Sequence, residues 1–294
     1  MPLFNSIHDL KEICHDGKSI AEVAIAYEIE LTGNSPEQVV RQMKTRITVM
    51  REGIKKGRRK LKSRSGWVGS EAWTLEHSTE SPDLCGNVIT HAMINALALS
   101  DVNACMGRIV AAPTAGSCGV LPGAVLAVAD EFNLDEEIIT DAMFVAGAIG
   151  TVIERNATFS AAEAGCQAEC GTASAMAAAS IAYLRQGNND AIFNAAALAL
   201  KNCLGLSCDP IGGLVEIPCV KRNAFYAAHA IIAASLALSG IKSLISFDGV
   251  IDAMMKTASN MTTALKETAN GGLAITDEGR SMAAKFNRQQ THQR

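Results

Sequence analysis

Residues 163–184 read EAGCQAECGTASAMAAASIAYL, and this stretch decides the class of fold that we expect. It is rich in alanine, the strongest helix former, and Gly187 follows it at a position typical of a helix end. The stretch therefore predicts one long helix. Because its side chains are mostly small, neighbouring helices can approach it closely, so tight helix packing is the expected outcome.

Signals for helix starts recur along the rest of the chain. Ser19-Ile-Ala-Glu22 and Ser35-Pro-Glu-Gln38 are capping boxes, in which the first and fourth side chains satisfy free backbone N–H groups. Asn133-Leu-Asp-Glu136 opens a third helix, whose apolar residues fall mostly at three- and four-residue spacing. Further helices are expected over residues 190–204, 223–238 and 250–266.

Signals for β-strands are missing from the sequence. It shows no sustained alternation of apolar and polar residues, and no hairpin turn flanked by β-branched runs. We therefore predict an all-α protein, a compact helical domain of about ten helices with cysteine-bearing loops. A single domain is expected over residues 1–294, with a polar, frayed tail after about residue 277.

Composition narrows the classes of function. A net charge of -4 gives no general attraction to nucleic acid or to anionic membranes. The longest uncharged runs, 109–129 and 223–241, are too rich in small or helix-breaking residues for a spanning helix, so we expect them to be buried in protein. Nine cysteines without a secretory signal indicate a reducing, cytoplasmic location.

Three cysteines are candidates for a metal site: Cys166, Cys208 and Cys219. Cys166 lies near the predicted start of the long helix, where free N–H groups favour a thiolate. Prolines and glycines between Cys208 and Cys219 allow that segment to curl so that both sulfurs face one point. Lys221 and Arg222 follow Cys219 and can offset thiolate charge.

These local features leave two interpretations equally open, a metal site and a set of buried, unreactive thiols. The spacing matches neither closely packed ferredoxin cysteines nor the paired Cys-x-x-Cys of structural zinc sites. Cys170 lies four residues after Cys166 on the same helical face, and can supply a fourth ligand. Three ligands would leave a metal open for chemistry, whereas four would close the site.

Residues 113–123, PTAGSCGVLPG, lead into a helix around Val120. Their glycines suit a nest of backbone N–H groups that binds an anion, with Thr114 and Ser117 adding hydroxyl donors. A tight connection between helices, lined by small residues, is an equal alternative. Residues 51–64 hold eight basic side chains, which indicate a solvated helix end or a docking surface for an acidic partner chain.

The residues around these cysteines resemble the iron–sulfur-dependent bacterial L-serine dehydratases, also called serine deaminases. The likeness covers most of the chain from about residue 87 to Leu273. The segments that carry it are Glu163-Ala-Gly-Cys-Gln-Ala-Glu169, Ala112-Pro-Thr-Ala-Gly-Ser117, Lys266-Glu-Thr and the long run LGLSCDPIGGLVEIPCVKRN over residues 204–223.

What the resemblance implies is specific. In that family Cys166, Cys208 and Cys219 would bind a [4Fe–4S] cluster and leave one iron open as a Lewis acid. The catalytic domain would be all-helical, with Thr114, Gly116 and Ser117 in contact with substrate. The reaction would convert L-serine to pyruvate and ammonia.

The sequence departs from the single-chain members of that family. Those begin with an additional α/β domain and end in a cysteine-bearing tail, whereas here helices begin near Ser6 and the C-terminus has no cysteine. The chain is thus similar to the alpha chain of a two-chain enzyme, with a beta chain supplying the other domain. The resemblance then implies that a base carried by that domain, a histidine in a Ser-His-Thr segment, is on the partner, so the catalytic base is unassigned here.

Two alternatives stay open. One is a related cluster-dependent lyase that acts on another small β-substituted or β-hydroxy acid. The other is a structural zinc or redox-sensing scaffold, in which Cys170 completes a four-thiolate site.

Overall fold

The computed structural model describes residues 4–14, 17–78 and 84–291, and this part of the chain is all-helical. The predicted fold class is therefore confirmed, although short helices bring the number of α-helices in these ranges to thirteen. They are α1 (Ile7–Cys14), α2 (Ile20–Thr32), α3 (Pro36–Gly57), α4 (Glu71–Glu76), α5 (Gly86–Ala104), α6 (Val120–Glu131), α7 (Glu136–Asn156), α8 (Ala161–Ala164), α9 (Cys166–Leu184), α10 (Asn189–Lys201), α11 (Cys219–Leu238), α12 (Phe247–Asn260) and α13 (Asp277–Thr291).

Three short 3₁₀ turns complete the described elements: η1 (Ile211–Gly213), η2 (Thr263–Leu265) and η3 (Gly272–Ile275). The described residues form no β-strand, and an isolated bridge between Cys208 and Lys266 is their only β-type pairing. The polar tail after residue 277 forms α13 as far as Thr291, and its last three residues lie outside the described part.

Two of the three predicted helix starts have the expected caps. Ser19 and Ser35 each form a complete capping box, and Pro36 is the first residue of α3. The third start differs: Asn133 lies in a turn with a left-handed backbone (φ 50°), and α7 begins at Glu136 after Asp135. An asparagine tolerates that turn conformation, so it ends the preceding connection instead of capping the helix.

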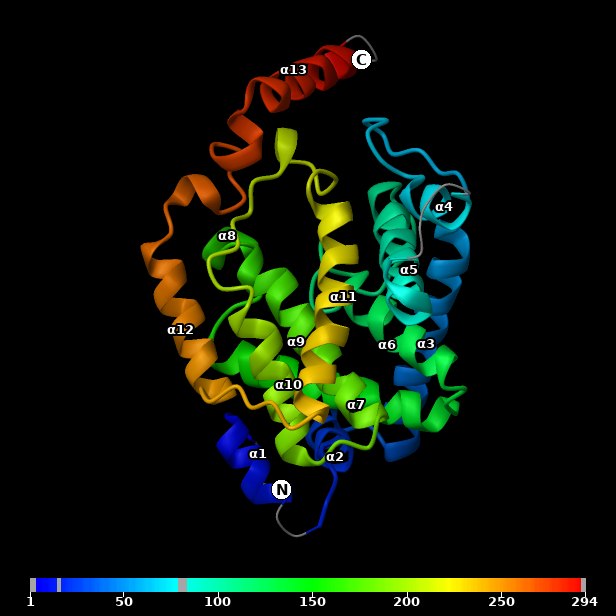
Figure 1. Cartoon of the computed structure of the whole chain (residues 1–294), viewed down its shortest axis with the longest axis vertical. Coiled ribbons are helices and arrows are strands. Elements are labelled where there is room, and N and C mark those ends of the chain that lie inside the picture. The colour runs from blue at the N-terminus through cyan, green and yellow to red at the C-terminus, as the bar shows by residue number, and fades with distance from the viewer. Residues whose placement is uncertain (1–3, 15–16, 79–83, 292–294) are drawn as a thin grey trace.

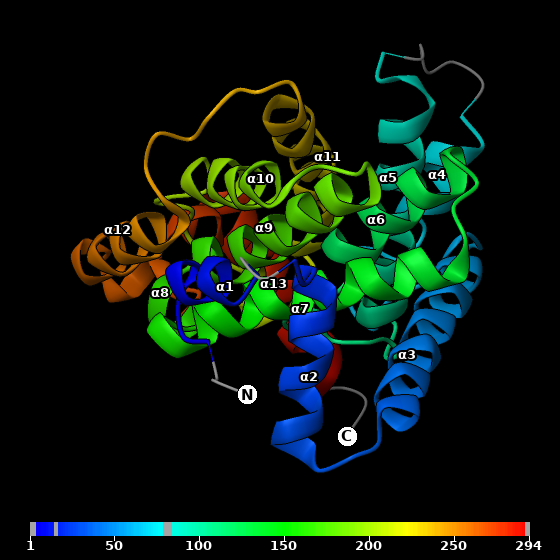
Figure 2. The same cartoon turned by 90° about the horizontal axis from the view of Figure 1, so that it is seen from below.

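The Ala-rich helix α9 is the centre of the core. Nearly all its residues are buried, and α6, α7, α10 and α11 pack around it (Figures 1 and 2). Small residues set how closely the helices approach: a Cβ on Gly123 of α6 would lie 2.9 Å from the Ala96 amide nitrogen of α5. None of the helices in the described ranges is long and apolar enough to cross a membrane.

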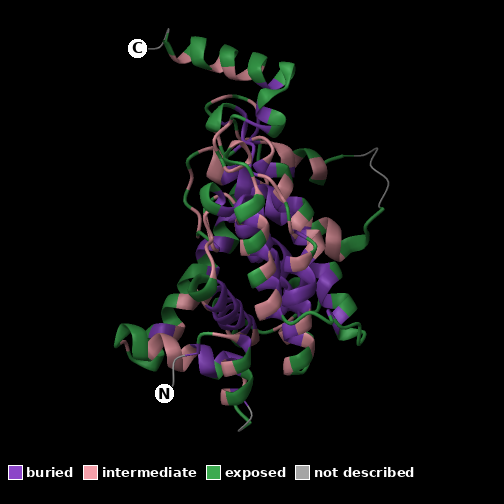
Figure 3. Ribbon diagram, turned by 90° about the vertical axis from the view of Figure 1, so that its left-hand side faces the viewer, coloured by how far each residue is buried: buried purple, intermediate pink, exposed green. Residues whose placement is uncertain are grey.

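Several loops meet where α9 and α11 begin. They are the connection before α6, the segment between α10 and α11, and the stretch after α12 that holds η2 and η3. The chain termini lie toward opposite ends of the long axis, and α13 lies beyond this loop region (Figure 1). Burial colouring shows the helical interior as buried, whereas α13 is mostly exposed (Figure 3).

Candidate metal and substrate site

The three candidate cysteines lie at the ends of elements. Cys166 is the first residue of α9, Cys219 is the first residue of α11, and Cys208 lies in the loop that follows α10. All three are buried. A helix N-terminus carries free N–H groups and partial positive charge, so Cys166 and Cys219 both lie where a thiolate is stabilised.

The thiols are close enough to act on one another. Hydrogen bonds from Cys170 and then Cys208 hold the pKa of Cys166 well below its ordinary value, with the Arg222 charge helping. Burial, followed by the negative charge of Cys166, raises the pKa of the Cys219 thiol. The pKa of Cys208 is also raised, first by its hydrogen bond to Cys166. Several sulfur atoms therefore lie close together in one buried region.

The break between α8 and α9 places Cys166 at this point. Instead of the single helix expected from Glu163, the chain turns at Gly165, which has a left-handed φ of 74°. A Cβ on Gly165 would lie 2.7 Å from the Leu206 carbonyl oxygen. Glycine is thus required both by its backbone angle and by the approach of the loop before Cys208.

The loop between Cys208 and Cys219 is tied at both ends. Its interior turns at Gly212 and Gly213, both with left-handed φ, and the Ile211 amide donates to the Ile217 carbonyl over 3.0 Å. Outside the loop, the Cys208 amide donates to Leu265, and the Glu267 amide donates to the Cys208 carbonyl, each over 2.8 Å. The segment after α12 therefore holds the backbone of Cys208 in place.

Arg222 is the cation that reaches the cysteines. Its Nη1 lies 3.5 Å from Cys166 Sγ and donates to the Ser207 carbonyl over 2.9 Å, while Nη2 donates to Asp209 Oδ1 over 2.9 Å. Asp209 in turn accepts from the Leu273 amide through Oδ2. Lys221, also predicted to offset thiolate charge, points elsewhere and forms an ion pair of 2.6 Å with Glu71.

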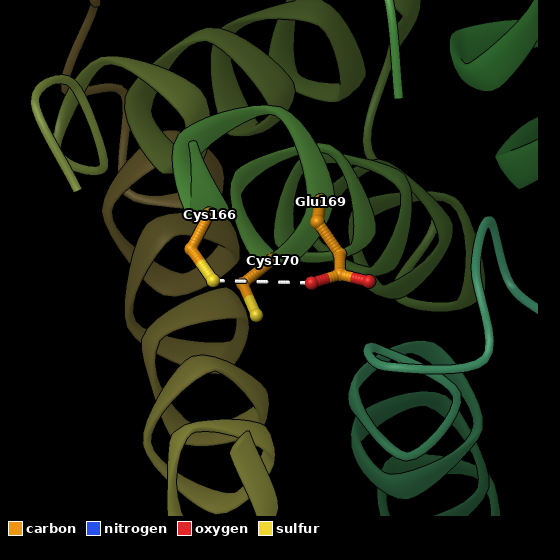
Figure 4. Close-up of side chains that lie close together, drawn as sticks. All are labelled: Cys166, Glu169 and Cys170. Carbon is orange, nitrogen blue, oxygen red and sulfur yellow. Dashed lines mark hydrogen bonds between the residues drawn. The ribbon is translucent and has the colours of Figure 1, made fainter. Parts of the chain in front are cut away.

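Glu169 and Cys170 lie beside Cys166 on the first turn of α9 (Figure 4). The three side chains form a compact group of possible metal ligands, and Cys166 Sγ lies 3.8 Å from Glu169 Oε2. Glu169 was not among the site residues predicted from the sequence. Its spacing from Cys166 was the available signal, because residues three apart on a helix share a face.

The loop before α6 packs against Glu169. Thr114 Oγ1 donates to Glu169 Oε1, and Ser117 Oγ lies 3.0 Å from Thr114 Oγ1. Gly116 makes room for this contact, because a Cβ there would lie 2.4 Å from Glu169 Oε1. Asn223 of α11 holds the loop from the other side, donating to the Gly116 carbonyl and accepting from the Gly119 amide.

These contacts change what the loop offers to a ligand. The amides of Ser117, Cys118, Gly119 and Val120 all donate to acceptors within the chain, so they do not form an open nest. Ser117 is fully buried, whereas Thr114 and Gly116 are partly exposed. The loop therefore reaches the cysteines through the Thr114 hydroxyl, which donates to the Glu169 carboxyl beside Cys166.

Known proteins similar to this chain are serine dehydratases. The family described as "Serine dehydratase alpha chain" matches residues 15–274. The chain is 45% identical over 286 residues to the probable L-serine dehydratase alpha chain of Bacillus subtilis, across 97% of this chain and 95% of that protein. It is 37% identical over 287 residues to the L-serine dehydratase alpha chain of Peptoniphilus asaccharolyticus, across 97% and 98%. L-serine dehydratase TdcG of Escherichia coli is 38% identical over 282 residues, across 92% of this chain and 62% of that protein.

Proposed function

The chain belongs to the serine dehydratase alpha chain family, and from this membership we propose that it is the alpha chain of an L-serine dehydratase. Such an enzyme is a lyase that converts L-serine to pyruvate and ammonia. The observation that supports the proposal is the hydrogen bond between the buried side chains of Cys166 and Cys208, near enough to buried Cys219 for the Cys166 charge to act on it.

The donor set fits an iron–sulfur cluster. Cys166, Cys208 and Cys219 would hold a [4Fe–4S] cluster, because thiolates are the ligands that such clusters use and three of them leave one iron free. When bound, the cluster supplies a Lewis acid for the hydroxyl group of the substrate. Arg222, fixed by Asp209, offsets negative charge at Cys166.

The Thr114 loop is the proposed contact with the substrate. Thr114 and Gly116 are partly exposed and lie next to Glu169, so they can touch a molecule held at the cysteines. Ser117 is buried, and its role is to hold the Thr114 hydroxyl from behind. Replacing Ser117 with alanine would then weaken serine binding indirectly, through a less well-oriented Thr114.

A second chain completes the proposed enzyme. Two of the relatives are named as alpha chains, which supports a beta chain as partner. We assign removal of the α-proton to that beta chain and no residue of this chain. We expect a cytoplasmic location, because nine free cysteines suit a reducing compartment.

Anaerobic co-expression with the beta chain tests the function. We expect a coloured complex with about four irons per alpha chain that forms pyruvate from L-serine. Cys166→Ser, Cys208→Ser and Cys219→Ser should each lose iron and activity. A colourless, iron-free complex that still converts L-serine would contradict the proposal.

Cys170 distinguishes the dehydratase from a zinc or redox scaffold. Its hydrogen bond to Cys166 and its burial make it the candidate fourth ligand of the scaffold alternative. For the dehydratase we expect Cys170→Ser to keep its iron, because the cluster needs three protein ligands. One zinc per chain, lost in Cys170→Ser, would instead favour the scaffold.

A further inference from the structure

Glu169 connects the two halves of the site. Its Oε1 accepts a hydrogen bond from Thr114 of the loop before α6, and its Oε2 lies 3.8 Å from Cys166 Sγ (Figure 4). Gly116 lies so close to Oε1 that no side chain fits between them. A molecule bound between the loop and the cysteines would therefore meet the Glu169 carboxyl.

The hydroxyl groups behind Glu169 point their protons toward it. Thr114 donates its proton to the Glu169 carboxylate, so the proton shared between Thr114 and Ser117 must come from Ser117. The Ser117 amide also donates to Thr114 Oγ1, over 3.3 Å. The chain of hydrogen bonds thus ends in acceptor oxygens, and such a set binds a cationic donor better than a carboxylate.

Metal binding leaves Glu169 short of a partner. Cys166 Sγ lies 3.8 Å from Oε2, and a metal-bound sulfur has no proton to donate to it. The two cations that follow Cys219 are used elsewhere, Arg222 by Asp209 and Ser207, and Lys221 by Glu71. A partly buried carboxylate oxygen without a donor from the protein is costly, so the site favours an incoming cation.

The limited exposure of Glu169 and the charges near it also favour a bound cation. Glu169 is only partly exposed, and Cys166 Sγ lies 3.8 Å from its Oε2, so a metal-bound thiolate would place negative charge beside the carboxylate. Glu267, whose backbone is left-handed at φ 61°, adds a further negative charge near Glu169. The surroundings therefore disfavour an unpaired Glu169 carboxylate, and a positive group placed beside it would relieve that cost.

We propose that Glu169 binds the α-ammonium group of the substrate and so makes the site specific for an amino acid over a hydroxy acid of the same shape. The inference rests on the proposed function, because it needs an amino-acid substrate at the cysteines. An ammonium group has three donors, and each of the two Glu169 oxygens keeps a lone pair that can accept one of them. Glu169 is then a residue that selects the substrate.

The test compares two ligands that differ in the ammonium group. L-serine and 3-hydroxypropionate share a carboxylate and a β-hydroxyl, and only L-serine carries the amine. The reconstituted alpha–beta complex is assayed for KM and kcat with L-serine. Calorimetry under nitrogen measures the dissociation constant of 3-hydroxypropionate, so one readout is independent of turnover.

For Glu169→Gln we expect the KM for L-serine to rise about 10- to 100-fold, the size of one charge-assisted hydrogen bond. The affinity for 3-hydroxypropionate should stay within about threefold. Glu267→Gln is the matched control, because it also removes a negative charge near Cys166, and it should raise the serine KM less. Iron content and visible absorption should equal those of the wild type.

Equal weakening of both ligands in Glu169→Gln would overturn the inference, since Glu169 would then only orient Thr114. An unchanged serine KM would overturn it as well. If Glu169→Gln loses iron, the serine KM and the 3-hydroxypropionate affinity are compared in Glu169→Asp instead. That variant keeps the negative charge but moves it away by the length of one methylene group. A wild-type complex that neither binds nor converts L-serine would contradict the proposed function itself, a result that is separate from these.

Discussion

Asp101 of α5 is fully buried and shows the cost of a carboxyl group in this core. Its Oδ2 accepts from the Ala72 amide, but Oδ1 finds no hydrogen-bond donor among the described residues. Burial, and after it a hydrogen bond to Glu71, raise the pKa of Asp101 to about 7. Burial opposes ionisation of Glu71 too, but hydrogen bonds from Lys221 and the Gly69 amide lower its pKa to about 2. Asp101 therefore carries the proton that the pair shares.

This pair predicts how stability depends on pH. Because the pKa of Asp101 is raised from 3.8 to about 7, the folded protein holds a proton that the unfolded chain has lost across that window. The free energy of unfolding should therefore fall as pH rises from about 4 to about 7, by about 3–4 kcal/mol for this group. Asp101→Asn keeps an acceptor for the Ala72 amide and a donor for Glu71 but cannot ionise. Its unfolding free energy should therefore lack the part of the pH dependence that Asp101 causes.

Urea unfolding of the wild type and of Asp101→Asn at several pH values checks this prediction. The quantity of interest is the difference between the two proteins, because Glu169 and Asp141 also have raised pKa values and act with the same sign. The difference should grow from near zero at pH 4 to its full size near pH 7. Parallel curves for the two proteins would show that Asp101 is ionised at neutral pH.

Residues at the site differ in how far the sequence predicts them. That Cys166 lies near a helix start follows from local composition, but its place as the first residue of α9 depends on the break at Gly165. The partner of Lys221 does not follow, because Glu71 lies 150 residues earlier and only folding brings the two together. Burial of Ser117 depends in the same way on the approach of other helices, which no local pattern encodes.

At the scale of elements, helices α3, α5 and α6 are joined by backbone contacts that only glycine allows. A Cβ on Gly57 of α3 would lie 2.0 Å from the Ala98 carbonyl oxygen of α5. A Cβ on Gly119, just before α6, would lie 2.3 Å from the Ala96 carbonyl oxygen. The loop that holds Thr114 leads directly into α6, so the spacing of α5 and α6 sets where that loop lies.

Gly123→Ala tests this packing. Its new Cβ would meet the backbone of Ala96 at 2.9 Å, and backbone cannot move aside cheaply, so we expect a loss of about 1–3 kcal/mol in unfolding free energy. Gly147→Ala on α7 is the control, because an exposed Cβ there would meet nothing within 4 Å. It should stabilise the protein by up to about 1 kcal/mol through helix propensity. Thermal unfolding of both variants shows whether each one is stabilised or destabilised. If both variants are destabilised, alanine is unfavourable in these helices in general, and the contact with Ala96 is not the cause.

Elements show the same division between local and long-range causes. The capping boxes at Ser19 and Ser35 are predictable because all their atoms lie within four residues. The break at Gly165 is not predictable from the Ala-rich pattern around it, since the Leu206 carbonyl that requires it comes from a distant loop. The sequence therefore predicts helix identity well and predicts interruptions near the site poorly.

At the scale of the whole molecule, α13 connects regions that are far apart in the sequence. It packs on η1, which lies between Cys208 and Cys219, and the Phe286 ring lies 5.7 Å from the Trp67 ring. A Cβ on Gly212 would touch both Ala283 and Trp67 at 3.7 Å. The outer side of the cysteine loop thus rests against α13 and the Trp67 segment, although α13 itself is mostly exposed (Figure 3).

Phe286→Ala should release α13 without unfolding the core. The aromatic pair is worth about 1 kcal/mol, and Gly279 is the only buried residue of the helix between Asp277 and Thr291, so the pair is a large share of what holds α13. We expect amide hydrogen exchange across α13 to speed up about fivefold or more, with α9 and α10 unchanged. Trp67 fluorescence should change as well, and only one other tryptophan is present to mask it.

Phe225→Ala is the matched control, because that ring is 74% exposed on α11 and should leave α13 unaffected. Equal exchange in Phe286→Ala and the wild type would show that η3 and Gly279 hold the helix, and that the Trp67 contact is incidental.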